Sequence, residues 1–437
     1  MHIPRPVMSL RRQLLILGIL SFACLLRAQD FPLRFDHLSL EQGISHNLVY
    51  AIHQDQTGFM WFGTMYGLVK YDGRRYTIYR HDPNDAHSIS YNDIIAIYED
   101  QQGYLWIGTW GGGLNRFDPL TEKFTRFMHD PANPASLSNN MVWAIAEDEH
   151  GRLWLGTDHG LDRLHIEKNL KTGETTDSSL AYATFVHYQF TSFANDKLKQ
   201  TSVRALLKDS SGRLWAGAIG GGLNLFDAAR ETFLRFKHDP VNAKSLSRNA
   251  VNSIYEDRAG NLWIGTIGGG LNRLVFAEET TAETKTLPSP ERAEFVHYVH
   301  EPDNPHSLSQ NEIGPIVEDR NGHLWVGTMG GGLNRFDPAT GRILRVQRDP
   351  AQAYSLSSNV IVALCEDRSG ILWIGSYQGG VDKLDPYRQQ FQHVREETVP
   401  ASGLSYGDVR AICQDRSGAI WVGTFGGGLT QLSPEGR

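Results

Sequence analysis

The sequence has little of the features that mark several common functions. Its 437 residues contain no basic block and carry a formal net charge of -7. Because phosphate neutralisation needs clustered lysine and arginine, nucleic-acid binding is disfavoured. No H-E-x-x-H or His-x-x-x-His pattern is present, and the repeated acidic pairs fall in turns. We therefore predict no metal site, no cofactor and no catalytic residue.

Cysteine is also scarce, with three residues in the whole chain. Cys365 and Cys413 occupy equivalent places in neighbouring copies of a repeated segment, ALCED and AICQD. A disulfide needs Cα atoms within about 7 Å, which equivalent positions of adjacent repeats seldom reach. We predict two buried free thiols in strands.

Long apolar runs are limited to the N-terminus. Arg11 and Arg12 precede the apolar run at 14–26, which a small residue and polar sequence follow. This order is typical of a secretory signal peptide, here residues 1–29. The run is short for a membrane span, and an uncleaved anchor is the alternative. We predict that residues 30–437 lie on the periplasmic or extracellular side.

What the sequence does contain is a repeat. Eight of the ten tryptophans recur in one pattern, mostly about 48 residues apart. These are Trp61, Trp106, Trp154, Trp215, Trp263, Trp325, Trp373 and Trp421. Within one copy, short β-branched or aromatic segments at 94–100, 104–109, 114–118 and 123–130 are bounded by Gly, Asn, Asp or Pro, which is typical of strands. Four strands per repeat predict an all-β fold, a β-propeller of four-stranded blades.

The number of repeat units is eight, and the last one lacks a fourth strand. The N-terminal segment 31–40 resembles such a strand with no unit before it. We predict one ring over residues 30–437, closed when this N-terminal strand pairs with the three C-terminal strands, because closure removes open edges. The alternative is a seven-bladed ring followed by the start of a second ring.

Glycine-rich turns recur with the tryptophans, as in GTWGGGLNRFDP at 108–119. A phosphate-binding loop would precede a helix, whereas these glycines lie between two strands. We interpret them as turns that need positive φ and close backbone approach. The Asp-x-x-Gly before each tryptophan is likewise interpreted as a hairpin turn, and the tryptophan as packing between blades.

The segments LWIGT, GGGLNRFD and HDPxNPxSLSxN, together with the signal peptide, resemble the two-component regulator propeller family. The resemblance implies an extracytoplasmic sensor region of a hybrid histidine kinase or a related bacterial receptor, with an oligosaccharide or other small molecule as ligand. It also implies a histidine kinase or other signalling domain as partner, in cis or in trans, since no kinase motif occurs in these residues. The oligomeric state is left open, a dimer included.

Binding positions are expected where the repeats differ from one another. The residue after Gly-Thr and the second residue of the first strand vary most. Aromatic faces with a few polar partners suit sugar rings. The candidate ligand-binding residues are Tyr50, Trp110, Trp143, Asp158, Arg204, Tyr377, Arg410 and Phe425. We expect Trp110 and Arg410 to share a glycan site near the channel mouth; the alternative is that these side chains only fill the channel or the blade interfaces.

Two classes of function follow from the repeat. A sensing or binding propeller without enzymatic activity is favoured by the uniform repeats. The alternative is an exported propeller enzyme, a polysaccharide lyase or glycosidase whose residues are scattered over several blades. His159 with Asp158 and Asp162 is a small polar cluster that we interpret as a variant turn.

Overall fold

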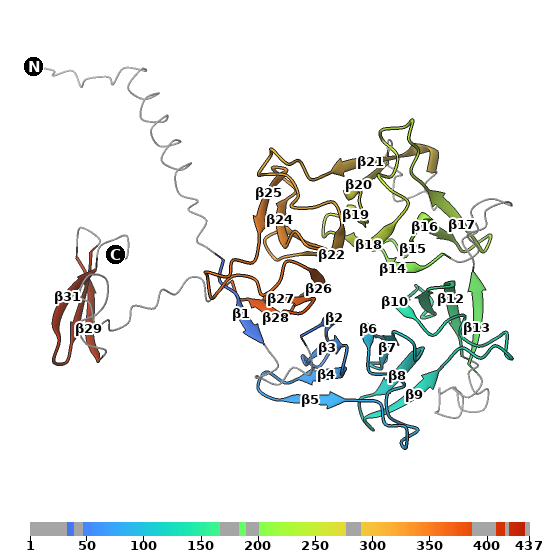
Figure 1. Ribbon diagram of the computed structural model, residues 1–437, viewed down its shortest axis with the longest axis horizontal. Coiled ribbons are helices and arrows are strands. Elements are labelled where there is room, and N and C mark those ends of the chain that lie inside the picture. Colours follow the sequence, from blue (N-terminus) through green and yellow to red (C-terminus); the bar gives the residue numbers. More distant parts are fainter. Residues whose placement is uncertain are drawn as a thin grey trace, which may run out of the picture. The chain divides into compact units, whose positions relative to one another are not determined.

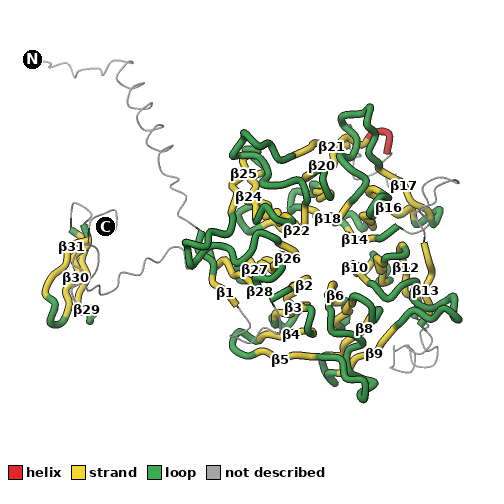
Figure 2. Tube along the Cα trace, viewed as in Figure 1, coloured by secondary structure: helices red, strands yellow, loops and turns green. Residues whose placement is uncertain are grey.

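The computed structural model describes most of the chain as two compact units, Met1–Asp385 and Pro386–Arg437. The described residues are 33–38, 47–166, 183–188, 201–276, 290–386, 408–415 and 419–432. The predicted signal peptide, residues 1–29, lies outside them. Within this part of the chain the helical element is a single 3-10 turn, Pro290–Arg292, and no helix there is long and apolar enough to cross a membrane (Figure 2).

The first unit is a ring of seven four-stranded antiparallel blades (Figure 1). Blade 1 consists of β2 (Val49–Gln54), β3 (Met60–Thr64), β4 (Gly67–Tyr71) and β5 (Tyr76–Tyr79), and blade 2 of β6 (Ile94–Glu99), β7 (Leu105–Thr109), β8 (Leu114–Asp118) and β9 (Lys123–Phe127). Blade 3 consists of β10 (Val142–Glu147), β11 (Leu153–Thr157), β12 (Gly160–His165) and β13 (Thr184–Tyr188). Blade 4 consists of β14 (Val203–Lys208), β15 (Leu214–Ala218), β16 (Gly222–Asp227) and β17 (Thr232–Phe236). Blade 5 consists of β18 (Val251–Glu256), β19 (Leu262–Thr266), β20 (Gly270–Phe276) and β21 (Ala293–Tyr298). Blade 6 consists of β22 (Ile313–Glu318), β23 (Leu324–Thr328), β24 (Leu333–Asp337) and β25 (Arg342–Val346). Blade 7 consists of β26 (Ile361–Glu366), β27 (Leu372–Ser376), β28 (Gly380–Leu384) and β1 (Asp36–Leu38).

The ring closes one repeat earlier than the sequence suggested. The N-terminal strand β1 pairs with β28 of the seventh repeat, with Asp36 opposite Lys383 and Leu38 opposite Val381. The innermost strands β2 and β26 then contact each other across the junction (Figure 1). The expected pairing of the N-terminal strand with the eighth repeat is therefore wrong, and the seven-bladed alternative describes the ring. The repeat count could not decide this, because the packing angle between blades sets how many of them close a circle.

The apolar core of the ring lies between adjacent blades. Trp61 of blade 1 packs edge-on against Phe117 of blade 2, with ring centroids 5.4 Å apart, and Trp263 contacts Phe336 of the next blade in the same way at 5.4 Å. Both tryptophans are at most 1% exposed. The tryptophan repeat is thus blade-to-blade packing, as its spacing indicated.

Each tryptophan is also fixed at its polar end. In all eight repeats the indole Nε1 donates a hydrogen bond of 2.7 to 2.9 Å to the carboxylate of the Asp that opens the hairpin turn. The other oxygen of the same carboxylate caps the turn, as where Asp100 accepts from the backbone N–H of Tyr104 at 3.0 Å. The Asp-x-x-Gly sequence therefore forms a turn and satisfies a buried indole at once.

The glycine-rich segments are turns between strands, as expected. Gly113 links β7 to β8 at φ 75°, in the left-handed region. A Cβ at this position would lie 2.3 Å from the carbonyl oxygen of Phe127, so a side chain does not fit. The segment is a framework feature rather than a phosphate-binding loop.

The second unit contains the eighth repeat by itself. β29 (Val409–Gln414), β30 (Ile420–Thr424) and β31 (Gly428–Leu432) form a three-stranded antiparallel sheet. Trp421 Nε1 donates to Asp415 Oδ2 at 2.8 Å, so the local motif is intact. Cys413 is exposed rather than buried, which contradicts one of the two predicted buried thiols; Cys365 in β26 is largely buried, and both are free.

Candidate ligand-binding site

Backbone hydrogen bonds bring the two variable rows together on one face of the ring. The N–H of the residue after Gly-Thr donates to the carbonyl of the residue just before the innermost strand of the same blade. Trp110 N to Asp93 O is 2.9 Å, and Ile219 N to Ser202 O is 2.8 Å. Tyr377 N to Val360 O is 2.9 Å. The second variable row is the second residue of the innermost strand, two positions after the residue whose carbonyl accepts this hydrogen bond. Both rows therefore lie near the ring axis, where the first strands of the blades meet (Figure 1).

Aromatic side chains of three consecutive blades are in contact at this face. The rings of Tyr50 and Trp110 are 6.3 Å apart, and those of Trp110 and Trp143 are 4.8 Å apart at 72°. Tyr377 of blade 7 lies close enough to Tyr50 to affect its titration. Burial, and then Asp93 and Tyr377, raise the pKa of Tyr50 to about 12. We call Tyr377, Tyr50, Trp110 and Trp143 the aromatic arc.

The members of the aromatic arc differ in accessibility. Trp110 is 38% exposed and Tyr377 is 44% exposed, so each presents a ring to solvent. Trp143 is engaged on all sides: its ring contacts Trp110, its face carries the Arg204 guanidinium at 3.4 Å, and its Nε1 donates to Asp158 Oδ1 at 2.7 Å. Trp143 therefore positions its neighbours, while Trp110 and Tyr377 offer free surface.

Arg204 and Asp158 face each other across the boundary of blades 3 and 4. The hydroxyl of Ser202 donates to Asp158 Oδ1 at 2.8 Å and accepts from Arg204 Nε at 3.0 Å. Burial lowers the pKa of Arg204, and Asp158 partly offsets that effect. The pair is thus a partly desolvated cation and its counter-ion, both beside the aromatic arc.

Asp93 is a member of the site that the sequence reasoning missed. Its Oδ1 is buried without a hydrogen-bond partner, and burial raises the pKa of this carboxyl to about 6. The signal that could have found it is a third variable row, the residue before the innermost strand. In the described blades this row reads Leu48, Asp93, Met141, Ser202, Ala250, Glu312 and Val360.

The far side of the ring axis has a different chemistry. Blades 5 and 6 contribute Ile267 and Met329 after the Gly-Thr, with Asn252 and Gly314 on the first strand. Ile267 is 42% and Met329 is 36% exposed. The aromatic arc and the pair of Arg204 and Asp158 are therefore gathered on blades 7, 1, 2, 3 and 4, and these blades hold the candidate site.

Two of the candidate residues lie in the other unit. Arg410 donates to Asp408 at 2.8 Å and lies 5.4 Å from the Phe425 ring, both within the second unit. Trp110 belongs to the first unit. The expected pairing of Trp110 with Arg410 stays a prediction.

In the polar cluster of His159, Asp158 and Asp162, the two carboxylates bond to different partners. Asp162 is 1% exposed and accepts from the ring of His187 and from Ser138 N, each at 2.7 Å. Asp158 instead bonds Trp143 and Ser202. Among the described residues no group of three His, Cys, Asp or Glu side chains is placed to hold a metal ion.

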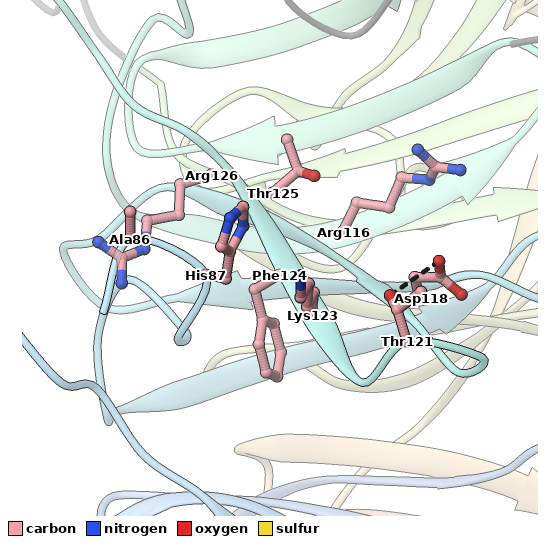
Figure 3. Close-up of a pocket in the computed structure, with 9 residues that line it drawn as sticks. All are labelled: Ala86, His87, Arg116, Asp118, Thr121, Lys123, Phe124, Thr125 and Arg126. Carbon is pink, nitrogen blue, oxygen red and sulfur yellow. Dashed lines mark hydrogen bonds between the residues drawn. The ribbon is translucent and has the colours of Figure 1, made fainter. Parts of the chain in front are cut away.

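A cavity of about 400 Å³ lies elsewhere, at the outer rim of blade 2 (Figure 3). It is lined by Ala86, His87, Arg116, Asp118, Thr121, Lys123, Phe124, Thr125 and Arg126. Its cations serve the fold: Arg116 stacks 3.5 Å from the centre of the Tyr104 ring, and Arg126 donates to Ser88 Oγ at 2.7 Å. Figure 3 shows Arg116 extending away from His87 and Arg126, so the cavity does not gather them around one point.

The repeat can be compared with known families. A family model described as two component regulator propeller matches residues 43–66, 88–111, 136–159, 245–268, 307–330, 355–378 and 403–426. The repeats of this chain are therefore two component regulator propeller repeats. The matched segments of this regulator propeller include the eighth repeat, but none covers residues 160–244.

Individual relatives of this regulator propeller cover it unevenly. Histidine kinase P4 of Formosa agariphila is 41% identical over 64 residues, which are 15% of this chain and 5% of the kinase. The extracellular domain assigned to a hybrid two component system from B. thetaiotaomicron is 25% identical at a TM-score of 0.33, covering 93% of this chain and 66% of that domain. Virginiamycin B lyase from Staphylococcus aureus, 14% identical, covers 80% of this chain and 98% of the lyase at a TM-score of 0.54. The last likeness shows the fold alone.

Proposed function

We propose that this regulator propeller is the non-catalytic, ligand-binding sensor region of a bacterial two-component system, and that the aromatic arc binds an oligosaccharide. The matches to the family model and to a histidine kinase support the signalling role. Export by the predicted signal peptide, residues 1–29, places the propeller outside the cytoplasm. The kinase or other signalling partner acts in cis or in trans.

The aromatic arc is the observation that carries the ligand class. Sugar rings expose axial C–H groups that pack on flat aromatic faces, while their hydroxyl groups need directed polar partners. Trp110 and Tyr377 present partly exposed rings, and Arg204 and Asp158 lie beside Trp143. Ring contacts join Tyr50, Trp110 and Trp143 of blades 1 to 3, and Tyr377 lies on the adjoining blade 7.

The test is the thermal unfolding of the full chain with a panel of oligosaccharides. A ligand that binds only the folded state, present at 100 times its dissociation constant, stabilises it by about 2.7 kcal/mol. We expect particular oligosaccharides to raise the unfolding temperature, and Trp110→Ala or Tyr377→Ala to abolish that shift. Leu120→Ala is the control, because Leu120 is 93% exposed in a turn after β8. A melt that no oligosaccharide moves would refute the ligand class.

The enzyme alternative is separated by the same samples. Mass spectrometry of each oligosaccharide after prolonged incubation with the chain is expected to show intact ligand. Release of smaller or unsaturated products would replace the sensor by a glycosidase or a lyase.

A further inference from the structure

We infer that the pair formed by Arg204 and Asp158 clamps a vicinal diol of a neutral sugar, and that this pair makes the site select neutral over acidic oligosaccharides. The inference rests on the proposed function, since it names the ligand class of the same site. It concerns a site at the boundary of blades 3 and 4.

Four side chains at this boundary form a closed circuit. Arg204 lies on the Trp143 ring at 3.4 Å, Trp143 donates to Asp158, Asp158 accepts from Ser202, and Ser202 accepts from Arg204. Every member is held by two others, so the guanidinium and the carboxylate keep their places without a ligand. Such preorganisation lowers the entropy cost of binding.

The circuit leaves complementary groups free. Among the described residues, the hydrogen bond of Arg204 is made by Nε alone, so Nη1 and Nη2 remain as donors. Asp158 accepts both of its hydrogen bonds at Oδ1, and Oδ2 accepts none from a described residue. A single hydroxyl, that of Ser202, bridges the two side chains. Two neighbouring sugar hydroxyls can therefore bind together, one accepting from the guanidinium and one donating to Oδ2.

Charge balance disfavours an acidic ligand. The guanidinium is already countered by Asp158, and Asp93 adds a second carboxyl beside Tyr50. A uronate or sulfate would meet one paired cation and two carboxyl groups, and like charges across a binding surface oppose association.

The experiment is isothermal titration calorimetry of the full chain with neutral oligosaccharides and with oligogalacturonides, the latter both free and as methyl esters. Methyl esterification removes the charge and keeps the stereochemistry. We expect binding among the neutral ligands, weaker binding of any free acid than of its ester, and no loss of neutral-ligand affinity when the salt concentration is raised.

Two variants test the clamp. Asp158→Asn keeps one oxygen for Trp143 and Ser202 but replaces the free acceptor by a donor, and Arg204→Gln removes the fork. Because hydrogen bonds to charged groups contribute about 1.5–3 kcal/mol, each variant should weaken binding at least about tenfold. Leu120→Ala, at a side chain that is 93% exposed in a turn, should leave affinity unchanged. Unaltered melting of Asp158→Asn shows that lost binding is not lost folding.

The outcomes separate the inference from the proposed function. If acidic oligosaccharides bind and neutral ones do not, the selectivity is overturned while the sensor proposal stands. If neutral ligands bind equally to Asp158→Asn and Arg204→Gln yet not to Trp110→Ala, the clamp is overturned and the aromatic arc stands. If no oligosaccharide of either charge binds, the proposed function itself fails.

Discussion

The seventh and eighth repeats carry the same motif in two different settings. In the seventh, Trp373 is 4% exposed and Val381 is 0% exposed. In the eighth, the counterpart of Val381 is Leu429, which is 66% exposed, and Ile412 is 68% exposed. The hydrogen bond from the indole to the aspartate is the same in both, at 2.8 Å. The motif therefore builds a sheet by itself, whereas its burial comes from neighbouring blades.

The largest expected difference between the two repeats is the cost of removing the tryptophan. Trp373→Ala deletes a buried ring that contacts Phe62 and Tyr71 of blade 1, and should lower the free energy of unfolding of the ring by about 3–5 kcal/mol. Trp421→Ala, the matched change, should leave the ring transition unmoved in calorimetry. Equal losses from both substitutions would mean that the eighth repeat is buried by the ring after all.

The two cysteines should differ next. Burial raises the pKa of the Cys365 thiol to about 12, while Cys413 is exposed. Because the thiolate is the reactive form, we expect iodoacetamide to modify Cys413 at least about a hundredfold faster than Cys365 in the native protein. Peptide mass spectrometry reads the two sites separately. Similar rates in denaturant provide the control, and similar rates in the native state would contradict the difference in burial.

The strand β1, which completes blade 7, should make the stability of the ring depend on pH. His37 on β1 bonds Asp382, which is 0% exposed, at 2.7 Å; the eighth repeat has Thr430 in the place of Asp382. This hydrogen bond raises the pKa of His37. The folded state therefore binds the proton of His37 more tightly than the unfolded state does. The stabilisation that results is complete below about pH 6.5 and is lost as pH rises through the raised pKa of His37.

Removing that histidine tests the pH dependence. His37→Ala should lower the free energy of unfolding by about 1–3 kcal/mol at pH 6, because it leaves a buried carboxylate short of a partner. The difference from the parent chain should shrink at pH 9, where the histidine is neutral. Urea denaturation at both pH values measures it, and a loss independent of pH would show that the charge has no part in closing the ring.

The smallest expected effect concerns equivalent aspartates. Asp93 is half-buried with a pKa raised to about 6, whereas Asp408 is exposed and paired with Arg410 at 2.8 Å. When the pKa of a carboxyl is raised in the folded state, the free energy of unfolding falls as pH rises from about 4 to about 6. The ionised Asp93 therefore destabilises the ring at neutral pH. With allowance for solvent screening, Asp93→Asn should stabilise the ring by about 1 kcal/mol at pH 7 and by little at pH 4.

The matched change is Asp408→Asn in the eighth repeat. An exposed ion pair contributes at most about 1 kcal/mol, and we expect no change in the melting of the ring. Thermal melts of both variants at pH 4 and pH 7 make the comparison. Stabilisation by Asp408→Asn equal to that by Asp93→Asn would show that the desolvation of Asp93 is not the cause.

Much of the fold could be predicted from local sequence. The strands around Trp106 begin and end near the residues expected from Gly, Asn and Asp, because turn chemistry and strand alternation act over a few residues. The GGG turns and the Asp-x-x-Gly hairpins followed for the same reason. Of the candidate residues, Trp110, Trp143, Asp158 and Arg204 meet on blades 2 to 4, whereas Asp93 was not expected among them.

The sequence by itself determined a four-stranded all-β repeat, the place of each tryptophan between blades and the family whose repeats it resembles. These properties depend on contacts within a blade or on one conserved interface, so each repeat carries them separately. The tertiary structure alone decided that seven repeats close the ring, that β1 pairs with β28, and that Arg204 stacks on Trp143. Closure depends on the angle accumulated over all blade interfaces, and no single repeat encodes that sum.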